Sequence, residues 1–398
     1  MTTPSQLREE TTEASLRPDE EGWIPTPPVA LSDGTQIQLF KDGDGLRAAF
    51  EAIQSAKRRI CLEVYIFRSD DTGNAFADLL AKKSKEGVAV FVIYDSFGCF
   101  DSSASMFHKL KAAGVRLREF HPINPWESQF GWRPLNRDHR KLLFIDDHIA
   151  GIGGLNVGQE YAGSSIIHTT KCERWRDSGI GIVGPSARPF FQAFAKTWKH
   201  INSGGRIRRM QFEHDVDGGE LGVLASVPTI NSPLRPFVHQ MFRSATRSID
   251  LTMAYFAPDD ELIESLCSAA RKGVRVRLML PGKCDIRFLQ IAARSFYETL
   301  LNRSVQIYER EGVVLHSKTM VIDDAITVMG STNLDYRSIE YNCEISAIIR
   351  NRAFGQHMRA LFQHDIRFAK RISLAEWRYR PTRDRIVQWA VSRARYLL

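Results

Sequence analysis

Two sets of polar residues, repeated at one spacing, carry the groups in this sequence that could do chemistry. Each set holds one His, one Lys, one Asp and one Asn: His139, Lys141, Asp146 and Asn156 in the first, and His316, Lys318, Asp323 and Asn333 in the second. In both sets the Lys, Asp and Asn follow the His by two, seven and seventeen residues, and the second set lies 177 residues after the first. A polar start to a buried strand explains one such set. It does not explain two with identical spacing.

A pocket formed by both sets would bind an anion and contain a nucleophile and a proton donor. The lysines supply positive charge and the Asn amides donate hydrogen bonds, while one imidazole attacks phosphorus and the other protonates the leaving oxygen. Fixed cations and donors meet the charge that develops on the phosphoryl oxygens, so this chemistry needs no metal and no cofactor. The sequence therefore predicts metal-independent phosphoryl transfer, and its spacing does not assign the nucleophile.

The elements that must position these residues are predicted by the apolar runs around them. Residues two apart on a strand share a face, so His and Lys of each set are expected to point to one place. Asp146 and Asp323 have the opposite parity, which predicts that they support the scaffold. After a turn, a second apolar run (149–152 or 326–329) brings the chain back, and small residues before each Asn permit close approach of the backbone.

The two sets resemble the signature of the phospholipase D superfamily, which is His-x-Lys-x4-Asp followed by Gly-Gly/Ser-x-Asn. Gly153-Gly154-Leu155-Asn156 matches its second part in the first copy, and Gly330-Ser331-Thr332-Asn333 matches it in the second. Both copies are similar to bacterial cardiolipin synthases, from about residue 35 to about residue 370. The resemblance implies a phosphatidyltransferase that makes cardiolipin through a phosphohistidine intermediate. It also implies His139 as nucleophile and His316 as general acid and then base.

A catalytic imidazole needs an acceptor on its second nitrogen, which is usually a carboxylate. A carboxylate downstream of each motif is similar in position to those of the superfamily, so we assign Glu344 to His316 and Asp177 to His139. The second assignment requires an insertion of ten residues within 158–174. Glu173 is therefore the alternative to Asp177.

The fold is predicted by a strand, helix and strand rhythm that occurs twice. It runs through 60–66, 74–85 and 88–94, and again through 247–253, 259–271 and 272–280. We predict an α/β fold of two similar lobes related by a pseudo-twofold repeat, each a mixed, largely parallel sheet flanked by helices. The expected divisions are a disordered acidic tail (1–34), a first lobe (35–205), a linker (206–225), a second lobe (226–372) and a basic amphipathic segment (373–398).

Composition limits the setting in which the protein works. The 398 residues carry a formal charge of +8, and no stretch approaches 18 consecutive apolar residues. The N-terminus has no apolar signal core, which predicts a cytoplasmic protein, peripheral on the cytoplasmic face of the membrane. The six cysteines form no Cys-x-x-Cys pair, which argues against zinc or a redox motif. A basic body suits anionic lipid and nucleic acid equally well.

Aromatic residues near the motifs favour lipid. Trp126, Phe130 and Trp132 precede the first motif, and Tyr255 follows a predicted strand of the second lobe. These four are the expected substrate-binding residues, although the loop at 121–134 could equally pack against the scaffold. We expect an anionic phospholipid, phosphatidylglycerol, as partner, with phosphatidylethanolamine as a second candidate, together with a membrane surface, and we disfavour nucleic acid. The sequence leaves the oligomeric state open.

Two other functions remain open at this stage. A phospholipase D or other phosphodiesterase would use the same groups with water as acceptor, and a nuclease would be expected to carry a longer basic groove. An inactive lipid-binding scaffold is the third possibility, and the intact pairs of His, Lys and Asn count against it.

The C-terminal segment, residues 367–398, holds nine basic residues against two acidic ones. Val387, Val391, Ala394 and Leu398 form an apolar helical stripe within it. Such a helix can lie on an anionic bilayer, and it can equally dock on the second lobe.

Overall fold

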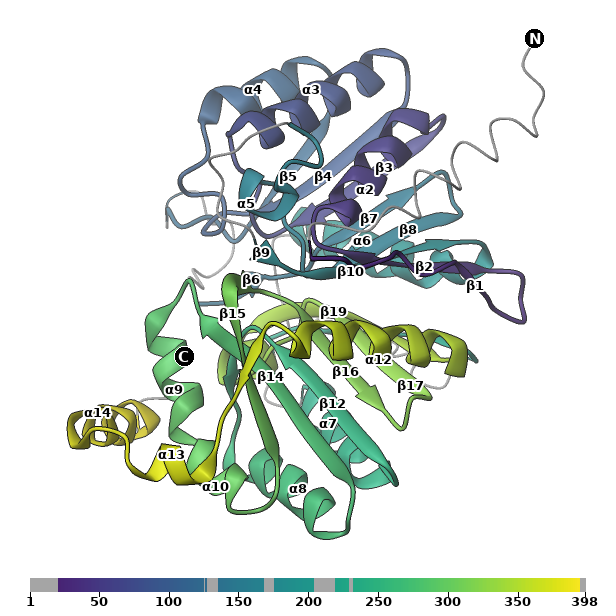
Figure 1. The fold of residues 1–398 in the computed structure, drawn as a ribbon. Helices are drawn as coiled ribbons and strands as arrows, with labels where there is room; N and C mark the ends of the chain where they lie inside the picture. The colour runs from purple at the N-terminus through teal and green to yellow at the C-terminus, as the bar shows by residue number, and fades with distance from the viewer. Residues whose placement is uncertain are drawn as a thin grey trace.

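The computed structural model describes residues 21–124, 126, 135–167, 175–203, 219–228 and 232–393. Two large sheets, one formed mainly by each half of the chain, are stacked with helices around them (Figure 1). This confirms the predicted α/β architecture of two similar lobes.

The first sheet carries three helices on one face and one on the other. In spatial order its strands are β1 (Val29–Ala30), β2 (Gln36–Lys41), β10 (Ser178–Val183), β8 (Ile149–Gly153), β7 (Leu142–Ile145), β3 (Arg59–Val64), β4 (Ala89–Asp95) and β5 (Arg116–Phe120). Its helices are α2 (Asp44–Ser55), α3 (Asp71–Lys85), α4 (Ala104–Ala112) and, on the face towards the second lobe, α6 (Arg188–Asn202), with the short η2 (Pro185–Ala187) and α5 (Gln159–Ala162) beside them. Because both faces are covered, the central strand β3 is buried along most of its length.

The second sheet repeats this order. Its strands are β11 (Leu221–Ser226), β19 (Asn342–Arg350), β17 (Ile326–Gly330), β16 (Lys318–Ile322), β12 (Ser248–Met253), β14 (Arg275–Lys283), β15 (Gln306–Leu315) and β20 (Ala369–Arg371). The small pair β13 (Phe256–Ala257) and β18 (Leu334–Asp335) lies apart from it. The helices are α7 (Leu234–Ser244), α8 (Asp260–Arg271), α9 (Arg287–Ser295), α10 (Tyr297–Leu301), α11 (Tyr336–Glu340), α12 (Arg352–Ile366), α13 (Leu374–Arg378) and α14 (Thr382–Arg393).

The repeat is visible in the helix caps. Asp70 accepts a hydrogen bond from the Gly73 amide at 2.8 Å and so caps α3, and Asp259 caps α8 through the Leu262 amide at 2.8 Å. An acceptor at this position satisfies an amide that has no partner within the helix. Each capped helix then crosses between two parallel strands, β3 and β4 or β12 and β14, which confirms the predicted strand, helix and strand units.

The prediction of largely parallel sheets was wrong. Parallel pairing is confined to β3, β4 and β5 in the first sheet and, along the main path of the second, to β12, β14 and β15; the other neighbours along both paths are antiparallel. The reason is that each motif strand folds back as a tight hairpin, β7 with β8 and β16 with β17, and a hairpin is antiparallel by construction. In each hairpin the two Asp residues of the turn adopt positive φ, which Asp tolerates better than most residues.

Two predicted boundaries were also wrong. Residues 21–34 are not a free tail, because Trp23 is buried and β1 pairs with β2. The linker predicted at 206–225 overlaps β11, which is an edge strand of the second sheet. The Pro-rich composition of the first segment concealed its contact with the core. Residues 1–20 and 206–218, which belong to those two predictions, lie outside the described residues.

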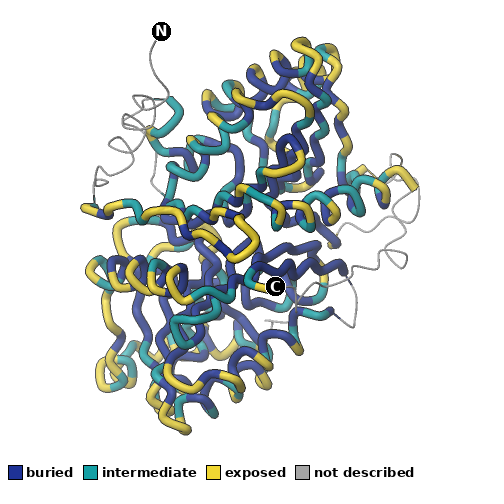
Figure 2. The backbone as a smooth tube through the Cα atoms, turned by 90° about the vertical axis from the view of Figure 1, so that its right-hand side faces the viewer, coloured by how far each residue is buried: buried dark blue, intermediate teal, exposed yellow. Residues whose placement is uncertain are grey.

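Two short strands cross between the lobes. β6 (Arg137–Asp138), from the first half of the chain, pairs in parallel with β19 of the second sheet, and β9 (Trp175–Arg176) pairs in parallel with β15. One apolar core lies between the lobes and takes side chains from both sheets and from α6 and α12. The tube of Figure 2 is accordingly mostly buried where the lobes meet. Sequence periodicity gave no sign of these crossing strands.

Candidate active site

The crossing strands bring the two motifs to the junction of the lobes. The His139 amide donates to the carbonyl of Cys343 at 3.0 Å, and the His316 amide donates to the carbonyl of Arg176 at 2.8 Å. His139 therefore lies beside β19 of the second half, next to Glu344. His316 lies beside β9 of the first half, next to Asp177, which follows that strand.

The two His–carboxylate pairs are the reverse of those predicted. Nδ1 of His139 lies 3.1 Å from Oε1 of Glu344, and Nδ1 of His316 lies 2.7 Å from Oδ2 of Asp177. The assignment of Glu344 to His316 and of Asp177 to His139 was wrong, because it assumed that each lobe completes its own site. The parallel pairing of β6 with β19 and of β9 with β15 exchanges the carboxylates. The alternative Glu173 lies outside the described residues.

Both carboxylates are fully buried and are held by other donors. Ser331 Oγ donates to Glu344 Oε2, and Asn342 Nδ2 donates to Glu344 Oε1 at 3.3 Å. Asp177 Oδ1 accepts from the Ser178 amide at 2.7 Å. A carboxylate fixed in this way orients the imidazole at Nδ1 and leaves Nε2 for chemistry.

Burial sets the protonation of the two imidazoles. Burial and the charge of Lys141 lower the pKa of His139 to about 4, and Glu344 only partly opposes this. Burial, Lys318 and Lys141 also hold the pKa of His316 well below its usual range. At neutral pH both rings are thus neutral in the free protein, the state that a nucleophilic imidazole requires.

The charge of Lys318 acts on Lys141 across the junction. Burial and the neighbouring Lys318 lower the pKa of Lys141 to about 7, and burial lowers the pKa of Lys318 to about 8. Lys141 Nζ donates to the carbonyl of His139 at 2.6 Å, and Lys318 Nζ donates to the carbonyl of His316. Two buried cations this close are costly without an anion, so the site is preorganised for a negatively charged group.

Asn156 and Asn333 hold equivalent positions. Asn156 Oδ1 accepts from the Ile66 amide at 3.0 Å, and Asn333 Oδ1 accepts from the Tyr255 amide at 3.2 Å. With the oxygen of each amide fixed by backbone, the nitrogen is turned away from that backbone as a donor. Both residues are buried, and each lies three residues beyond the strand that pairs with its motif strand.

Asp146 and Asp323 support the scaffold, as their parity predicted. Asp146 accepts three hydrogen bonds of 2.6–2.9 Å from the amides of residues 57–59. Asp323 accepts three of 2.7–2.8 Å from the amides of residues 246–248. These contacts tie each hairpin turn to the start of the neighbouring strand, β3 or β12, on the side away from the histidines.

Aromatic rings surround the imidazoles, and sequence reasoning missed most of them. The ring of Tyr65 lies 5.0 Å from that of His139, while Tyr161 and Trp175 lie 5.4 Å and 5.2 Å from His316. Tyr255, which was predicted, lies 6.4 Å from His316 and donates to Asp285 at 2.7 Å. The position of Tyr65 at the end of the predicted strand 60–66 could have indicated it. Nothing in the sequence placed Tyr161 near His316.

The aromatic loop before the first motif is only partly described. Trp126 has 95% of its surface exposed, so it does not pack against the scaffold. Phe130 and Trp132, the other two residues predicted there, lie outside the described residues. Among the residues that the structure describes, no group of three or more His, Cys, Asp or Glu side chains could hold a metal ion.

Comparison with known proteins assigns the family. A family model described as "Cardiolipin synthase, PLD-like domain" matches residues 49–165 and 238–366, which contain both motifs. The chain belongs to this family. It is an enzyme of the phospholipase D superfamily, as the motifs predicted.

Relatives match along almost the whole chain. The cardiolipin synthase of Geobacillus thermodenitrificans is 33% identical over 374 residues, 92% of this chain and 72% of that protein. The cardiolipin synthase of Alkalihalophilus pseudofirmus is 30% identical over 369 residues, 91% of this chain and 71% of that protein. In fold, the chain is similar to the phosphatidylserine synthase of Haemophilus influenzae, with a TM-score of 0.72, 14% identity, and coverage of 99% of this chain and 100% of that one.

Proposed function

We propose that this enzyme makes cardiolipin by transphosphatidylation, moving a phosphatidyl group from one anionic phospholipid to the hydroxyl of another. The observation that carries the proposal is the arrangement of His139 and His316. Each is held at Nδ1 by a buried carboxylate of the opposite half, and each lies within electrostatic reach of the other's lysine. Membership of the cardiolipin synthase family supports the same reaction.

The first half of the reaction forms a bond between the enzyme and phosphorus. Nε2 of His139 attacks the phosphodiester of phosphatidylglycerol, and the bond from phosphorus to the glycerol head group breaks. His316, protonated at Nε2, gives its proton to the leaving glycerol oxygen. Lys141, Lys318 and the two Asn amides hold the phosphoryl oxygens as charge develops on them.

The second half transfers the phosphatidyl group. His316, now neutral, removes the proton from a hydroxyl of a second phosphatidylglycerol. That oxygen attacks phosphorus, the bond from phosphorus to Nε2 of His139 breaks, and cardiolipin leaves with both histidines restored. Two phosphatidylglycerol molecules thus give one cardiolipin and one glycerol.

The bound phosphodiester itself adjusts the protonation of His316. The free protein holds this imidazole neutral because burial and the lysines oppose a further positive charge. A phosphodiester placed between the lysines neutralises part of that charge and so raises the pKa of His316 towards the protonated state. The general acid is then available when substrate is present.

The surface near the site suits a lipid interface. Phe97 and Phe100 follow β4 and are 57% and 74% exposed, and Asp95 at the end of that strand accepts from the Asp138 amide, next to His139. Ile286, 45% exposed, follows Asp285, which affects the pKa of His316. No described helix is long and apolar enough to cross a bilayer. These exposed apolar side chains support peripheral binding to a membrane surface, and we propose that it is the cytoplasmic face.

The proposal is tested by giving the purified protein phosphatidylglycerol vesicles, with and without phosphatidylethanolamine, and identifying products by mass spectrometry. We expect cardiolipin and one equivalent of glycerol. Phosphatidic acid in place of cardiolipin would show that water is the acceptor and that the enzyme is a phospholipase D. Cleavage of oligonucleotides without any lipid product would overturn the proposal.

A further inference from the structure

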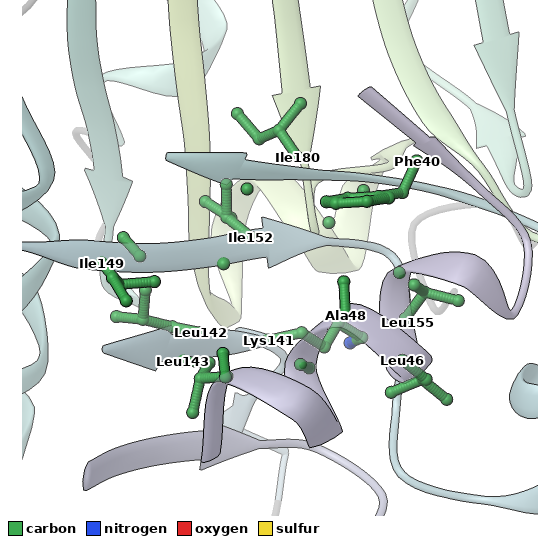
Figure 3. A pocket seen from close by; sticks show the side chains of 18 of the residues that line it. Phe40, Leu46, Ala48, Lys141, Leu142, Leu143, Ile149, Ile152, Leu155 and Ile180 are labelled. Carbon is green, nitrogen blue, oxygen red and sulfur yellow. The ribbon is translucent and has the colours of Figure 1, made fainter. Parts of the chain in front are cut away.

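An apolar cavity of about 320 Å³ lies in the first lobe, between α2 and the face formed by β2, β10, β8 and β7 (Figure 3). Its wall is almost entirely hydrocarbon. The side chains that Figure 3 labels there are Phe40, Leu46, Ala48, Lys141, Leu142, Leu143, Ile149, Ile152, Leu155 and Ile180. Glu63, one of the few polar residues of the lining, is already paired with Arg140 at 3.5 Å.

The cavity extends along the strands from the active site to the surface. One end is formed by Lys141 and by Gly153 and Gly179, which are paired across β8 and β10. The other end is formed by Ile149 and Val183, also paired, and Val183 is 46% exposed. The two ends are four residue steps apart along β8, which corresponds to about 13 Å. The cavity therefore has a cation at its inner end and, at its outer end, an opening where Val183 lies beside Gln36.

Among the residues that the structure describes, the equivalent place in the second lobe is largely filled by side chains. Asp146 binds the Arg59 amide and Asp323 binds the Ser248 amide, so β3 and β12 correspond at an offset of 189 residues, which also aligns the C-terminal ends of the helices before them, α2 and α7. At that offset the cavity side of α2 corresponds to larger residues of α7: Gly45 to Leu234, Ala48 to Phe237, Ala49 to Val238, and Ala52 to Met241. The space left beside Lys318 is about 20 Å³.

The sheet shows the same difference. Gly151 and Gly181, paired across β8 and β10, correspond to Val328 and Ile348, paired across β17 and β19. Backbone geometry does not require glycine at 151, because a Cβ there would meet its nearest neighbour, Leu143 Cβ, at an ordinary 3.7 Å. The fold thus accommodates side chains at these positions in one lobe and omits them in the other. An empty apolar cavity destabilises a protein, and the fold itself does not require this one. A bound apolar group that fills the cavity accounts for its presence.

We propose that this cavity binds one acyl chain of the phospholipid whose phosphate is held at Lys141 and His139. Its chemistry selects an amphiphile with an anionic head, because the lining offers hydrocarbon along its length and an ammonium group only at its inner end. The identity of the head group rests on the proposed function, whereas binding of an alkyl chain does not. In the second lobe, side chains fill the equivalent place beside Lys318. The second lipid is therefore predicted to place its acyl chains elsewhere.

The test fills the cavity with the residues of the other lobe. We combine Ala49→Val with Ala52→Met, and use Gln54→Met on the exposed side of α2 as the matched control. The assay compares kcat/KM for phosphatidylglycerol with sixteen-carbon and with six-carbon chains. In the filled variant we expect the ratio of the two values to fall at least tenfold, with the control keeping the wild-type ratio. An unchanged ratio in a folded, filled variant would overturn the proposal.

A binding measurement separates this inference from the proposed function. Dodecyl phosphate, kept below its micelle-forming concentration, is expected to raise the Tm of the wild-type protein saturably, and dodecyltrimethylammonium is not, because Lys141 repels it. The filled variant is expected to lose the response to dodecyl phosphate. Wild-type binding without any transfer activity would contradict the proposed function alone. Equal binding by wild type and filled variant would contradict the cavity alone.

Folding of the filled variant is checked by its own melting curve. Without ligand, we expect its Tm to equal or exceed that of the wild type, because the added side chains occupy empty apolar space. If the pair of substitutions prevents folding, Gly151→Ala adds one methyl group where the structure leaves room, and the same two measurements apply to it. A folded Gly151→Ala variant with wild-type chain-length preference and wild-type binding of dodecyl phosphate would then overturn the proposal.

Discussion

Nδ1 of His139 lies 3.1 Å from Oε1 of Glu344, a carboxylate that the chain supplies 205 residues later from the opposite lobe. His316 and Asp177 repeat the relationship in the reverse direction at 2.7 Å. Neither half of the chain therefore contains a complete histidine–carboxylate pair. The short crossing strands β6 and β9 couple the assembly of the site to the docking of the lobes.

The two histidines are predicted to fail at different steps. With a phosphodiester that releases p-nitrophenol, whose departure needs little protonation, His316→Ala is expected to give a burst of one equivalent of nitrophenol and then stall, because no base activates the acceptor. His139→Ala is expected to give no burst, since it lacks the nucleophile. Rapid-mixing absorbance measures both. A burst from His139→Ala and none from His316→Ala would exchange the two roles.

The crossed carboxylates give a prediction that distinguishes them from pairing within one lobe. Glu344→Gln is expected to slow the burst, since Glu344 orients His139, whereas Asp177→Asn is expected to leave the burst and slow steady turnover. Loss of an orienting or stabilising group of this kind costs about 10²–10³ in rate. Stopped-flow traces of both variants decide between the arrangements. The opposite assignment of effects would support pairing within each lobe.

The pH profile is predicted to be limited by the lysines on its alkaline side. Lysine is charged below its pKa, so anion binding by Lys141 is present at low pH and is lost as pH rises through about 7, followed by Lys318 near about 8. His139 stays neutral down to about pH 4. The general acid His316 must gain a proton, and its pKa in the free protein is well below the usual range, so kcat/KM is expected to decline with rising pH already below pH 7 and to decline more steeply above about pH 7, as the lysines lose their protons.

Lys141→Arg tests the cause of the alkaline decline. Arginine keeps its charge at these pH values, so the steeper decline of the activity that the variant retains is expected to begin only at about pH 8, where Lys318 loses its proton. A steeper decline that begins at the same pH as in the wild type would assign it to another group. The measurement is kcat/KM with a soluble short-chain substrate across the pH range.

The sequence predicted the members of the site better than their connections. Repeated spacing identified His139, Lys141, His316 and Lys318, because spacing along a strand is a local property. Parity likewise predicted that Asp146 supports the scaffold. The partner of each imidazole depends instead on pairing between strands far apart in sequence, and β6 and β9 are too short to carry any periodicity. For this reason the prediction from sequence paired Glu344 and Asp177 with the wrong histidines.

Packing between elements also escaped the sequence. The cavity beneath α2 depends on which small residues of that helix face which glycines of the sheet. The antiparallel majority of the strand pairs depended on how each hairpin joins β3 or β12. Both are properties of contacts across the fold, which hydrophobic pattern alone does not encode.

Asp146 in the hairpin turn of the first motif is predicted to stabilise the fold and not to take part in catalysis. Asp146→Asn replaces one of two carboxylate oxygens that accept backbone amides, and we expect a loss of about 2 kcal/mol in the free energy of unfolding. Asp147→Asn is the matched control, because Asp147 also has positive φ but makes only partly exposed ion pairs, with Arg58 and Arg59. Its effect is expected to stay below about 1 kcal/mol. Denaturant unfolding of both variants measures the difference.

The last prediction concerns how the C-terminal helix α14 contributes to membrane binding. Val391 is buried against Ala257 and Ala292, so this helix docks on the second lobe. Docking there was one of the two arrangements that the sequence allowed, the other being a helix that lies on the bilayer. The same helix leaves Ile386 and Trp389 exposed, at 60% and 62%, among its arginines. Burying such a side chain in the bilayer interface contributes about 1.5–3 kcal/mol, and each basic residue near an anionic surface contributes about 1 kcal/mol.

We therefore expect the double variant Ile386→Ser, Trp389→Ser to bind phosphatidylglycerol vesicles at least tenfold more weakly than the wild type. When binding is compared at several salt concentrations, the difference is expected to be clearest at low ionic strength. The Tm and the activity on a soluble short-chain substrate are expected to stay at wild-type values, because both side chains are already exposed. Val391→Ser is the contrasting variant and is expected to lower the Tm, since it removes the docking contact. Co-sedimentation with vesicles and a melting curve on each protein separate the two effects. Unchanged vesicle binding by the double variant would transfer membrane contact to the exposed Phe97, Phe100 and Trp126 near the active site.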